Sequence, residues 1–508
     1  MEAEELLKRY EIVKRYTEGE RDFARINLNE ANLSRINLSQ ANLSESSLFV
    51  TNLSGANLSE ANLTDANLNV ARLSSANLVR AILNGATMNV ANLVRADLTE
   101  AQLVGAALIR GELIRAELSK ANFSKANLTG ADLREAKLSE VNFSQTNLSG
   151  ANFRGASGMG VNFELANLHG ADMTKADLVG ADFSGADLRQ ANLSQVNFSG
   201  ANLSGTNLRW ADLSGANLSG TDLNEAKLSG ANLYGANLSN ANLVNASFVH
   251  ADLSVANLIG ADWVGADLSG SILSGAKLYD VPRFGIKAEE ITCEWVDLSA
   301  NGDHSQIHRF ASPEESKKFF NHRPPNVKII VDAALEYEAN CILATTYQQI
   351  AQNYSIVYRP PSIEVGYRKT TITFIIDSDE HLLPVGCMAI LPFNDAVLTQ
   401  KNLIALARNL QLQNIEKKRI VQLCTAMNEG INKVNELKKL MPFLNSESKI
   451  KFFQSPTQTI LNNSSEQSLI VQLNPNFGKK MPTSHPQKAL FPNTNKFVDF
   501  IESFYYLN

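Results

Sequence analysis

Hydrophobic residues recur at every fifth position from Phe23 to Leu278, with no insertion or deletion. Of these 52 positions, 51 are Leu, Phe, Met or Trp, and the single exception is Gly158. The residue two places earlier is Ala in 39 of the 52 units. A period of five matches neither the two-residue period of a strand nor the 3.6-residue period of a helix.

The pattern within each unit predicts a short strand followed by a turn. Two apolar residues that are two positions apart are typical of an extended chain with one face inward. The next apolar residue comes three positions later, and the intervening Ser, Gly, Asn and Asp residues favour turns. Because one unit cannot bury its own apolar face, we expect the units to stack into a solenoid.

Aromatic residues at the repeated position indicate that one coil contains four units. Positions 20 residues apart would then lie on one face, and six of the 13 positions in one such series are aromatic, against three of the other 39. The series includes Phe123, Phe143, Phe163, Phe183 and Trp263. We predict a ladder of stacked rings along this face. Duplication of a 20-residue segment is the alternative explanation, and it implies the same coil.

Gly158 interrupts the apolar series, and Met159 follows it directly. One interpretation is a kink or small bulge that creates a recognition site. The other, which we favour, is a local defect in which the flexible Met159 side chain fills the gap left by glycine. The five-residue register resumes at Phe163.

The consensus Ala-Asn/Asp-Leu-Ser-Gly resembles the A(D/N)LXX motif of the pentapeptide repeat family. The resemblance implies a mainly β fold, with a right-handed quadrilateral β-helix of 13 coils over residues 21–280. Its length would be roughly 62 Å at a strand spacing of ~4.8 Å. Residues 1–20 resemble the N-terminal segment of many family members, and we expect an amphipathic helix there to cap the first coil. Within residues 281–304, Trp295 and Leu298 are expected to cap the last coil.

Residues 305–412 predict a small α/β domain. We expect strands at 327–332, 362–366, 370–376 and 382–391, and helices at 339–352 and 397–412. Residues 413–444 predict a further helix, which we expect to pack on this domain because three heptads are short for a coiled coil. Residues 445–490 are rich in Ser, Asn, Gln, Pro and Lys, and predict a disordered linker.

Residues 491–508 predict a short amphipathic helix at the end of the chain. Its apolar residues Phe497, Phe500, Ile501 and Phe504 follow the spacing i, i+3, i+4 and i+7. A helix on a flexible tether suits docking into a groove on a partner. It suits equally well a helix that folds back onto its own domain, so both alternatives stay open.

Composition and motifs limit the cellular compartment and the kinds of functional site that we expect. The four cysteines are widely spaced, no secretory signal begins the chain, and no run of 18 apolar residues occurs. We therefore expect a cytoplasmic protein without membrane insertion. His304 and His308 could place two metal ligands on one helix face, but surface histidines are the favoured interpretation because no HExxH motif surrounds them. Since no phosphate loop, nucleophile elbow or kinase signature occurs, we expect no catalytic site, cofactor or metal.

Two functions follow from these patterns. The first is a scaffold for protein–protein interaction in which the C-terminal region recognises a protein partner and not nucleic acid. The second is DNA mimicry toward a type II topoisomerase such as gyrase, which some pentapeptide repeat proteins are known for. The repeats carry 24 acids and 18 bases, whereas duplex DNA of similar length carries about 36 charges, so charge argues for the first. An enzyme hidden in residues 305–412 is a weaker third hypothesis.

Overall fold

The computed structural model describes residues 2–282, 285–320, 324–353, 360–376, 378–410, 417–440, 450–465, 467–479 and 494–502. The chain forms two compact units, Met1–Asn321 and His322–Asn508. The predicted domain at residues 305–412 is therefore wrong in its boundaries: its first residues belong to the repeat unit, and strands after residue 450 complete its sheet.

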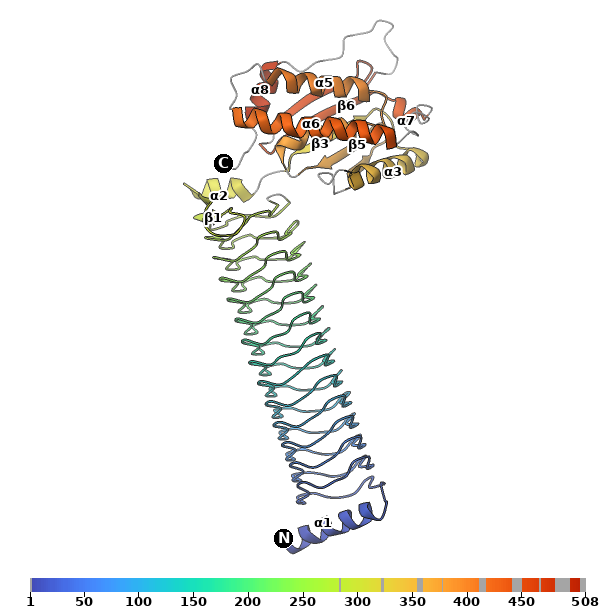
Figure 1. Cartoon of the computed structure of the whole chain (residues 1–508), viewed down its shortest axis with the longest axis vertical. Coiled ribbons are helices and arrows are strands. Elements are labelled where there is room, and N and C mark those ends of the chain that lie inside the picture. Colours follow the sequence, from blue (N-terminus) through green and yellow to red (C-terminus); the bar gives the residue numbers. More distant parts are fainter. Residues whose placement is uncertain are drawn as a thin grey trace. The chain divides into compact units, whose positions relative to one another are not determined.

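The repeats form a β-helix with 20 residues in each coil (Figure 1). The Asn or Asp position pairs in parallel with the residue 20 positions later, beginning at Asp22 with Asn42 and recurring in the units up to Asn257. The last such pair joins Lys277 to Asp297, so the coil continues past the predicted boundary at residue 280. The inward Leu and Ala side chains are buried throughout and form the continuous core that the spacing predicts.

Each unit closes with a turn. The N–H of Ala31 donates to the carbonyl of Leu28 at 3.2 Å, and this pattern recurs along the rod. The residue two positions after each inward residue has a positive φ, for example 60° at Arg25 and 64° at Gly55. Glycine adopts this conformation without strain. At corners without glycine, the N–H of the corner residue donates to a carbonyl of the next coil, and this hydrogen bond stabilises the positive φ.

Helix α1 (Glu2–Thr17) covers the first coil. The Arg9 guanidinium donates to the carbonyls of Asn32 and Ser34 at 3.1 and 2.9 Å. The hydroxyl of Tyr16 donates to the carbonyl of Ser39 at 3.0 Å. In inner coils the equivalent carbonyls accept from backbone N–H groups of the preceding coil, so α1 replaces the donors that a further coil would supply.

A hairpin and a helix close the other end of the rod. Strand β1 (Trp295–Asp297) pairs antiparallel with β2 (Ile307–Arg309), and α2 (Pro313–Phe320) follows. The N–H of Leu298 donates to the carbonyl of Gln306 at 2.8 Å. This hydrogen bond satisfies a ladder donor that would otherwise meet a further coil.

The second unit contains a five-stranded antiparallel sheet with strand order β4-β5-β3-β6-β7. The strands are β3 (Asn326–Val331), β4 (Ser362–Val365), β5 (Thr370–Ile375), β6 (Thr457–Asn462) and β7 (Ser468–Leu473). The helical elements are α3 (Tyr337–Asn353), η2 (Asp379–His381), α4 (Leu382–Ala389), α5 (Ala396–Leu410), α6 (Lys417–Leu440), α7 (Lys451–Gln454) and α8 (Thr494–Glu502). Helices α5 and α6 lie across the strands in Figure 1.

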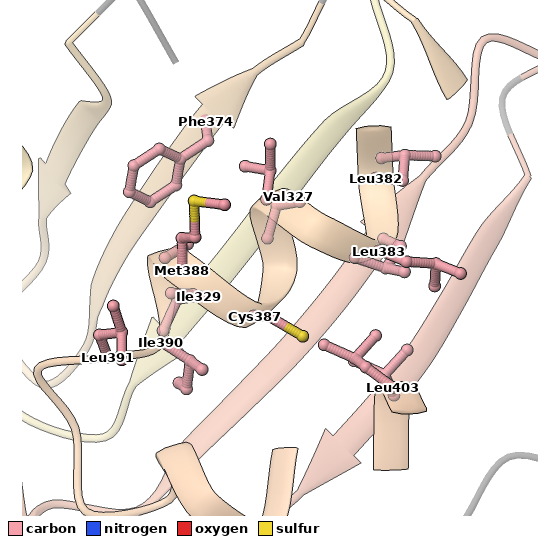
Figure 2. Close-up of a cluster of buried hydrophobic side chains, with 14 of the residues drawn as sticks. Val327, Ile329, Phe374, Leu382, Leu383, Cys387, Met388, Ile390, Leu391 and Leu403 are labelled. Carbon is pink, nitrogen blue, oxygen red and sulfur yellow. The ribbon is translucent and has the colours of Figure 1, made fainter. Parts of the chain in front are cut away.

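The core of this unit lies between the sheet and its helices (Figure 2). Val327 and Ile329 of β3 face Cys387 and Met388 of α4, and all four are buried. Strand β3 alternates half-buried and buried residues, so its helix-facing side forms the core and its other side is partly exposed.

Two predictions for this unit are wrong. Residues 382–391 were expected to form a strand, but Leu382–Ala389 is a helix with all eight residues buried. A short, wholly apolar segment has no periodicity that distinguishes a strand from a buried helix. Residues 445–490 were expected to be a disordered linker, but they contain α7, β6 and β7. Polar residues also take part in the buried face of these strands, since Thr457 and Thr459 of β6 are both fully buried.

Helix α6 packs on its own unit, as the sequence predicts. Its Leu423, Met427, Val434 and Leu437 belong to the buried core. Gly430 breaks the apolar spacing because α4 lies against it: a Cβ on Gly430 would lie 3.1 Å from the Cα of Pro384.

Candidate interaction surfaces

The four phenylalanines of the predicted ladder stack inside the rod. The ring centroids of Phe123 and Phe143 are 5.2 Å apart, those of Phe143 and Phe163 are 5.2 Å apart, and those of Phe163 and Phe183 are 4.6 Å apart. Their interplanar angles are 26°, 12° and 16°. All four rings are fully buried, so the ladder is a structural element and offers no surface to a ligand.

Trp263 lies in the same series, four coils beyond Phe183. It contacts Phe320 of α2 at a centroid distance of 6.3 Å. Its indole N–H donates to the carbonyl of Pro282. Trp263 is fully buried and therefore joins the last coils to the cap.

Gly158 is buried, and the backbone hydrogen bonds between coils continue through it in register. Its N–H donates to the carbonyl of Asp177 at 2.9 Å, so no bulge forms. The same coil holds two facing phenylalanines, Phe143 and Phe153, which meet edge to face at 6.0 Å. We attribute the missing side chain to the preceding coil, because a Cβ on Gly158 would lie 2.6 Å from the carbonyl carbon of Leu138. Met159 is 68% exposed, so the prediction that it fills the gap is wrong.

Trp295 and Leu298 lie at the end of the rod, where the sequence places the cap. Leu298 is buried, whereas Trp295 is half-buried. A Cβ on Gly275 would lie 3.1 Å from Cζ2 of Trp295, so the indole rests on the backbone of the preceding coil. The ring of His304 meets Trp295 edge to face at 5.6 Å.

His304 and His308 do not share a helix face. His304 lies in a bend with φ 62°, and its Nδ1 is 3.4 Å from Oδ2 of Asp297. His308 lies in β2 and stacks on Phe319 at 5.4 Å. Among the described residues, no group of three or more His, Cys, Asp or Glu side chains is arranged to hold a metal ion.

Asp297 organises the cap hairpin. Its carboxylate is fully buried and accepts hydrogen bonds from the N–H and hydroxyl of Ser299 and from the N–H of His304. Burial by itself raises the pKa of a carboxyl group. The hydrogen bonds from Ser299 and His304 outweigh burial and hold the pKa of Asp297 below its ordinary value. Nearby, hydrogen bonds from Ser305 and Ser299 lower the pKa of Asp303 to about 2.

Of the two alternatives left open for the C-terminal helix, the structure shows the one in which it folds back onto its own unit. Phe497, Phe500 and Ile501 of α8 are buried, with exposed fractions of 0%, 2% and 0%. The side-chain amide of Asn463 donates to the carbonyl of Phe500 at 3.0 Å. Phe504 lies outside the described residues. Docking of this apolar face onto a partner is therefore contradicted, because the face is already covered.

The outward corners of the rod show a feature that sequence reasoning missed. Several corner side chains lean toward the following coil, where they meet an opposite charge or a glycine. Arg80 and Glu100 form a salt bridge of 2.7 Å in this way. Trp210 instead lies over Gly230, where a Cβ would come within 2.8 Å of its Cδ2 atom. A large corner residue followed 20 positions later by glycine is the sequence signal that could have revealed Trp210.

Exposed apolar side chains occur on both units. On the rod they include Trp210 at 66% and Tyr234 at 54% exposed. On the second unit, Tyr367 is 98% exposed, and Val365 beside it is 58% exposed. Ile375 and Ile470, on the partly exposed face of the sheet, are 42% and 43% exposed. These exposed side chains could make apolar contacts with another molecule.

Two hollows on the rod are open to solvent and have mixed polar and apolar linings. One is lined by Val70, Ala71, Arg72, Ser74, Val90, Asn92 and Glu112, and the other by Asn224, Asn240, Ala241, Asn242, Val244, Gly260 and Asp262. Neither brings together an acid and a base in the geometry of a catalytic pair. Across the part of the chain that the structure describes, no helix combines the length and apolar character needed to span a bilayer.

Comparison with known proteins centres on the rod. The family model described as pentapeptide repeats matches residues 22–48 and, in overlapping stretches, 51–281. No curated protein matches the chain. Solved structures similar to the rod include HetL, a pentapeptide repeat protein involved in heterocyst differentiation regulation in Nostoc sp. strain PCC 7120. It is 33% identical, with 52% of this chain and 95% of HetL covered and a TM-score of 0.25.

Two further structures show the same range of similarity. A pentapeptide repeat protein from the thylakoid lumen of Arabidopsis thaliana is 36% identical over 20% of this chain and 69% of its own, with a TM-score of 0.19. A trypsin-treated variant of QnrB1, a plasmid-mediated fluoroquinolone resistance protein, is 22% identical over 41% of this chain and 92% of its own, with a TM-score of 0.23.

Proposed function

This chain belongs to the pentapeptide repeat family, and from that membership we propose that it is a non-catalytic scaffold for protein–protein interaction. The β-helix provides a rigid support, and the unit His322–Asn508 carries the specific recognition of a protein partner. The solenoid favours this role because stacked repeats present an extended surface of fixed geometry.

The observation that carries the proposal is the exposed hairpin tip between β4 and β5. Tyr367 is 98% exposed, and Val365 is 58% exposed. Arg368 and Lys369 follow directly, and the ammonium of Lys369 lies 4.7 Å from the ring centroid of Phe477. An exposed tyrosine with adjacent arginine is typical of the residues that contribute most to protein–protein binding.

The charges of the rod argue against DNA mimicry. In residues 21–160, 12 acids are balanced by 13 bases, and several pair between coils. Arg25 contacts Glu45 at 2.9 Å, and Arg115 contacts Glu135 at 2.7 Å. A surface with paired charges of both signs lacks the continuous negative potential of duplex DNA. We therefore expect no inhibition or protection of gyrase when the protein is added to a supercoiling assay.

Affinity purification from cells, followed by mass spectrometry, tests the assignment of recognition to the second unit. The full chain would be compared with a double variant, Val365→Ser with Tyr367→Ala, and with Tyr234→Ala on the rod as a matched control. We expect the control to recover the same partner as the natural sequence. The double variant should recover roughly tenfold less, as expected for loss of a central contact. Recovery that is undiminished in the double variant and lost in the control would contradict the assignment.

A further inference from the structure

Trp210 is exposed in a fixed position on the acidic half of the rod. Its backbone has a φ of 60°, its side chain is 66% exposed, and its N–H donates to the carbonyl of Ser229 at 3.1 Å. The indole rests on Gly230 of the following coil, where a Cβ would approach the ring to 2.8 Å or less. Its corner position is therefore defined by the backbone ladder and by the absence of a side chain at Gly230.

Two cations without a salt bridge among the described residues lie beside Trp210. Arg209 precedes it directly, and Lys227 lies on the same face in the next coil, where it pairs with Asn207. Both are exposed. Arg189, one coil earlier, differs because Asp187 holds it with N–O distances of 2.6 and 2.8 Å.

The surroundings make this a local basic patch in an acidic region. Residues 161–280 contain 12 acids and five bases, and three of those bases are Arg189, Arg209 and Lys227. The acids nearest in sequence, Asp212 and Glu225, belong to the two adjoining faces. Asp212 is already hydrogen bonded to the N–H of Ser214 and the side-chain amide of Asn232.

We propose that Trp210, Arg209 and Lys227 form a binding site for a short acidic segment of a partner protein. Carboxylates of the segment would contact Arg209 and Lys227, and an apolar side chain would lie on the indole of Trp210. Tryptophan and arginine are the residues most enriched among strong contributors to binding, and complementary charge selects the partner.

The charge pattern favours a peptide over nucleic acid. A nucleic acid strand carries its phosphates continuously, and beyond this patch it would meet the acidic faces that give residues 161–280 their 12 acids against five bases. A short segment with two or three carboxylates fits between them. This site is separate from the hairpin tip of the second unit, so either assignment can fail without the other.

Selection of random dodecapeptides displayed on phage, using the full-length protein, tests the proposal. We expect enriched peptides to combine Asp or Glu with an apolar residue. Binding of the most enriched peptide, followed by fluorescence anisotropy, should weaken roughly tenfold or more in Trp210→Ala and in the double variant Arg209→Gln with Lys227→Gln. Tyr234→Ala and Lys175→Gln, an exposed aromatic and an exposed cation on another face, serve as matched controls and should bind as the natural protein does.

A second measurement uses the tryptophans themselves. The chain has three, and Trp263 is fully buried whereas Trp210 is exposed, so bound peptide should reduce acrylamide quenching in the natural protein and not in Trp210→Ala. Peptides without acidic residues, equal weakening in the controls, or tighter Trp210-dependent binding of a thymidine oligonucleotide would each overturn the proposal.

Discussion

At the scale of single residues, the inward positions of the rod are not equivalent, because the space around each one differs. Phe153 and Gly158 illustrate this, since a large ring and a missing side chain occur in the same coil. The five-residue spacing identifies both positions as inward. It does not say how the residues share the interior, because that depends on distances across the coil.

Removal of one ring from the ladder should destabilise the rod. Phe143 contacts Phe123, Phe153 and Phe163, so Phe143→Ala is expected to cost ~3–5 kcal/mol through lost burial and an internal cavity. Denaturant unfolding followed by circular dichroism measures the change. Phe49→Ala, at a position 40% exposed, is the control and should change stability by less than ~0.5 kcal/mol. Equal losses of stability in the two variants would show that the stacked rings do not stabilise the rod.

Addition of one methyl group at Gly158 should also be costly. A Cβ there would lie 2.6 Å from the carbonyl carbon of Leu138 and 2.7 Å from its Cβ, so the backbone must shift. We expect Gly158→Ala to lose ~1–3 kcal/mol. Gly111→Ala is the matched control, because the repeat usually has Ala at that position and the nearest atom is 3.1 Å away. A tolerated Gly158→Ala would contradict our explanation of the defect.

At the scale of elements, the two caps end the β-helix by replacing ladder partners. Helix α1 supplies side-chain donors to the carbonyls of the first coil, and the β1–β2 hairpin supplies a carbonyl to the N–H of Leu298. Unpaired ladder groups at a sheet edge favour pairing with other chains. The caps therefore protect the rod from end-to-end association.

Loss of one cap hydrogen bond should loosen the first coil. Tyr16→Phe removes only the hydroxyl that donates to the carbonyl of Ser39, and we expect a loss of ~1 kcal/mol. Faster hydrogen exchange of the first-coil amides would report it. The same change at Tyr10, which is 68% exposed, should leave exchange unchanged. If both variants behave alike, the hydroxyl does not act as a cap.

The C-terminal cap should weaken in acid. The pKa of Asp297 is below its ordinary value and that of Asp303 is about 2 in the folded chain. Their stabilisation is therefore present above the unfolded pKa of about 3.9 and is lost as pH falls through the folded pKa. Between about pH 5 and pH 2, denaturant unfolding should show declining stability. The Asp297→Asn variant should be less stable at neutral pH, and its free energy of unfolding should change less with pH over this range. If the variant keeps the same pH dependence as the natural sequence, Asp297 does not have this role.

At the scale of the whole molecule, the rod is nearly one-dimensional and the second unit is not. Each coil contacts the coils before and after it through bridges between residues 20 apart. The sheet of the second unit pairs β3 with β6, and more than a hundred residues separate the two strands in the sequence. Insertions and deletions should therefore affect the two units differently.

Deletion of one whole coil should leave the rod folded. Removal of residues 231–250 takes out four complete units and restores every inward residue to the same face. Removal of residues 231–248 shifts the register by two, so the Ala of most later units would occupy the inward Leu position and Leu would move to an outward corner. We expect native-like circular dichroism in the first variant and loss of cooperative unfolding in the second. A stable second variant would show that the five-residue spacing does not determine the core.

The sequence by itself determined the rod. It gave the period, the four-unit coil, the aromatic ladder and the position of both caps, because each coil contacts only its neighbours and local spacing therefore specifies the packing. Tertiary structure alone decided the rest. Leu382–Ala389 is a helix because its surroundings bury every side of it, and β6 and β7 join a sheet with strands distant in sequence. Trp210 became visible as a site only when Gly230, Arg209 and Lys227 were placed around it, since residues in successive coils become neighbours only after the coil closes.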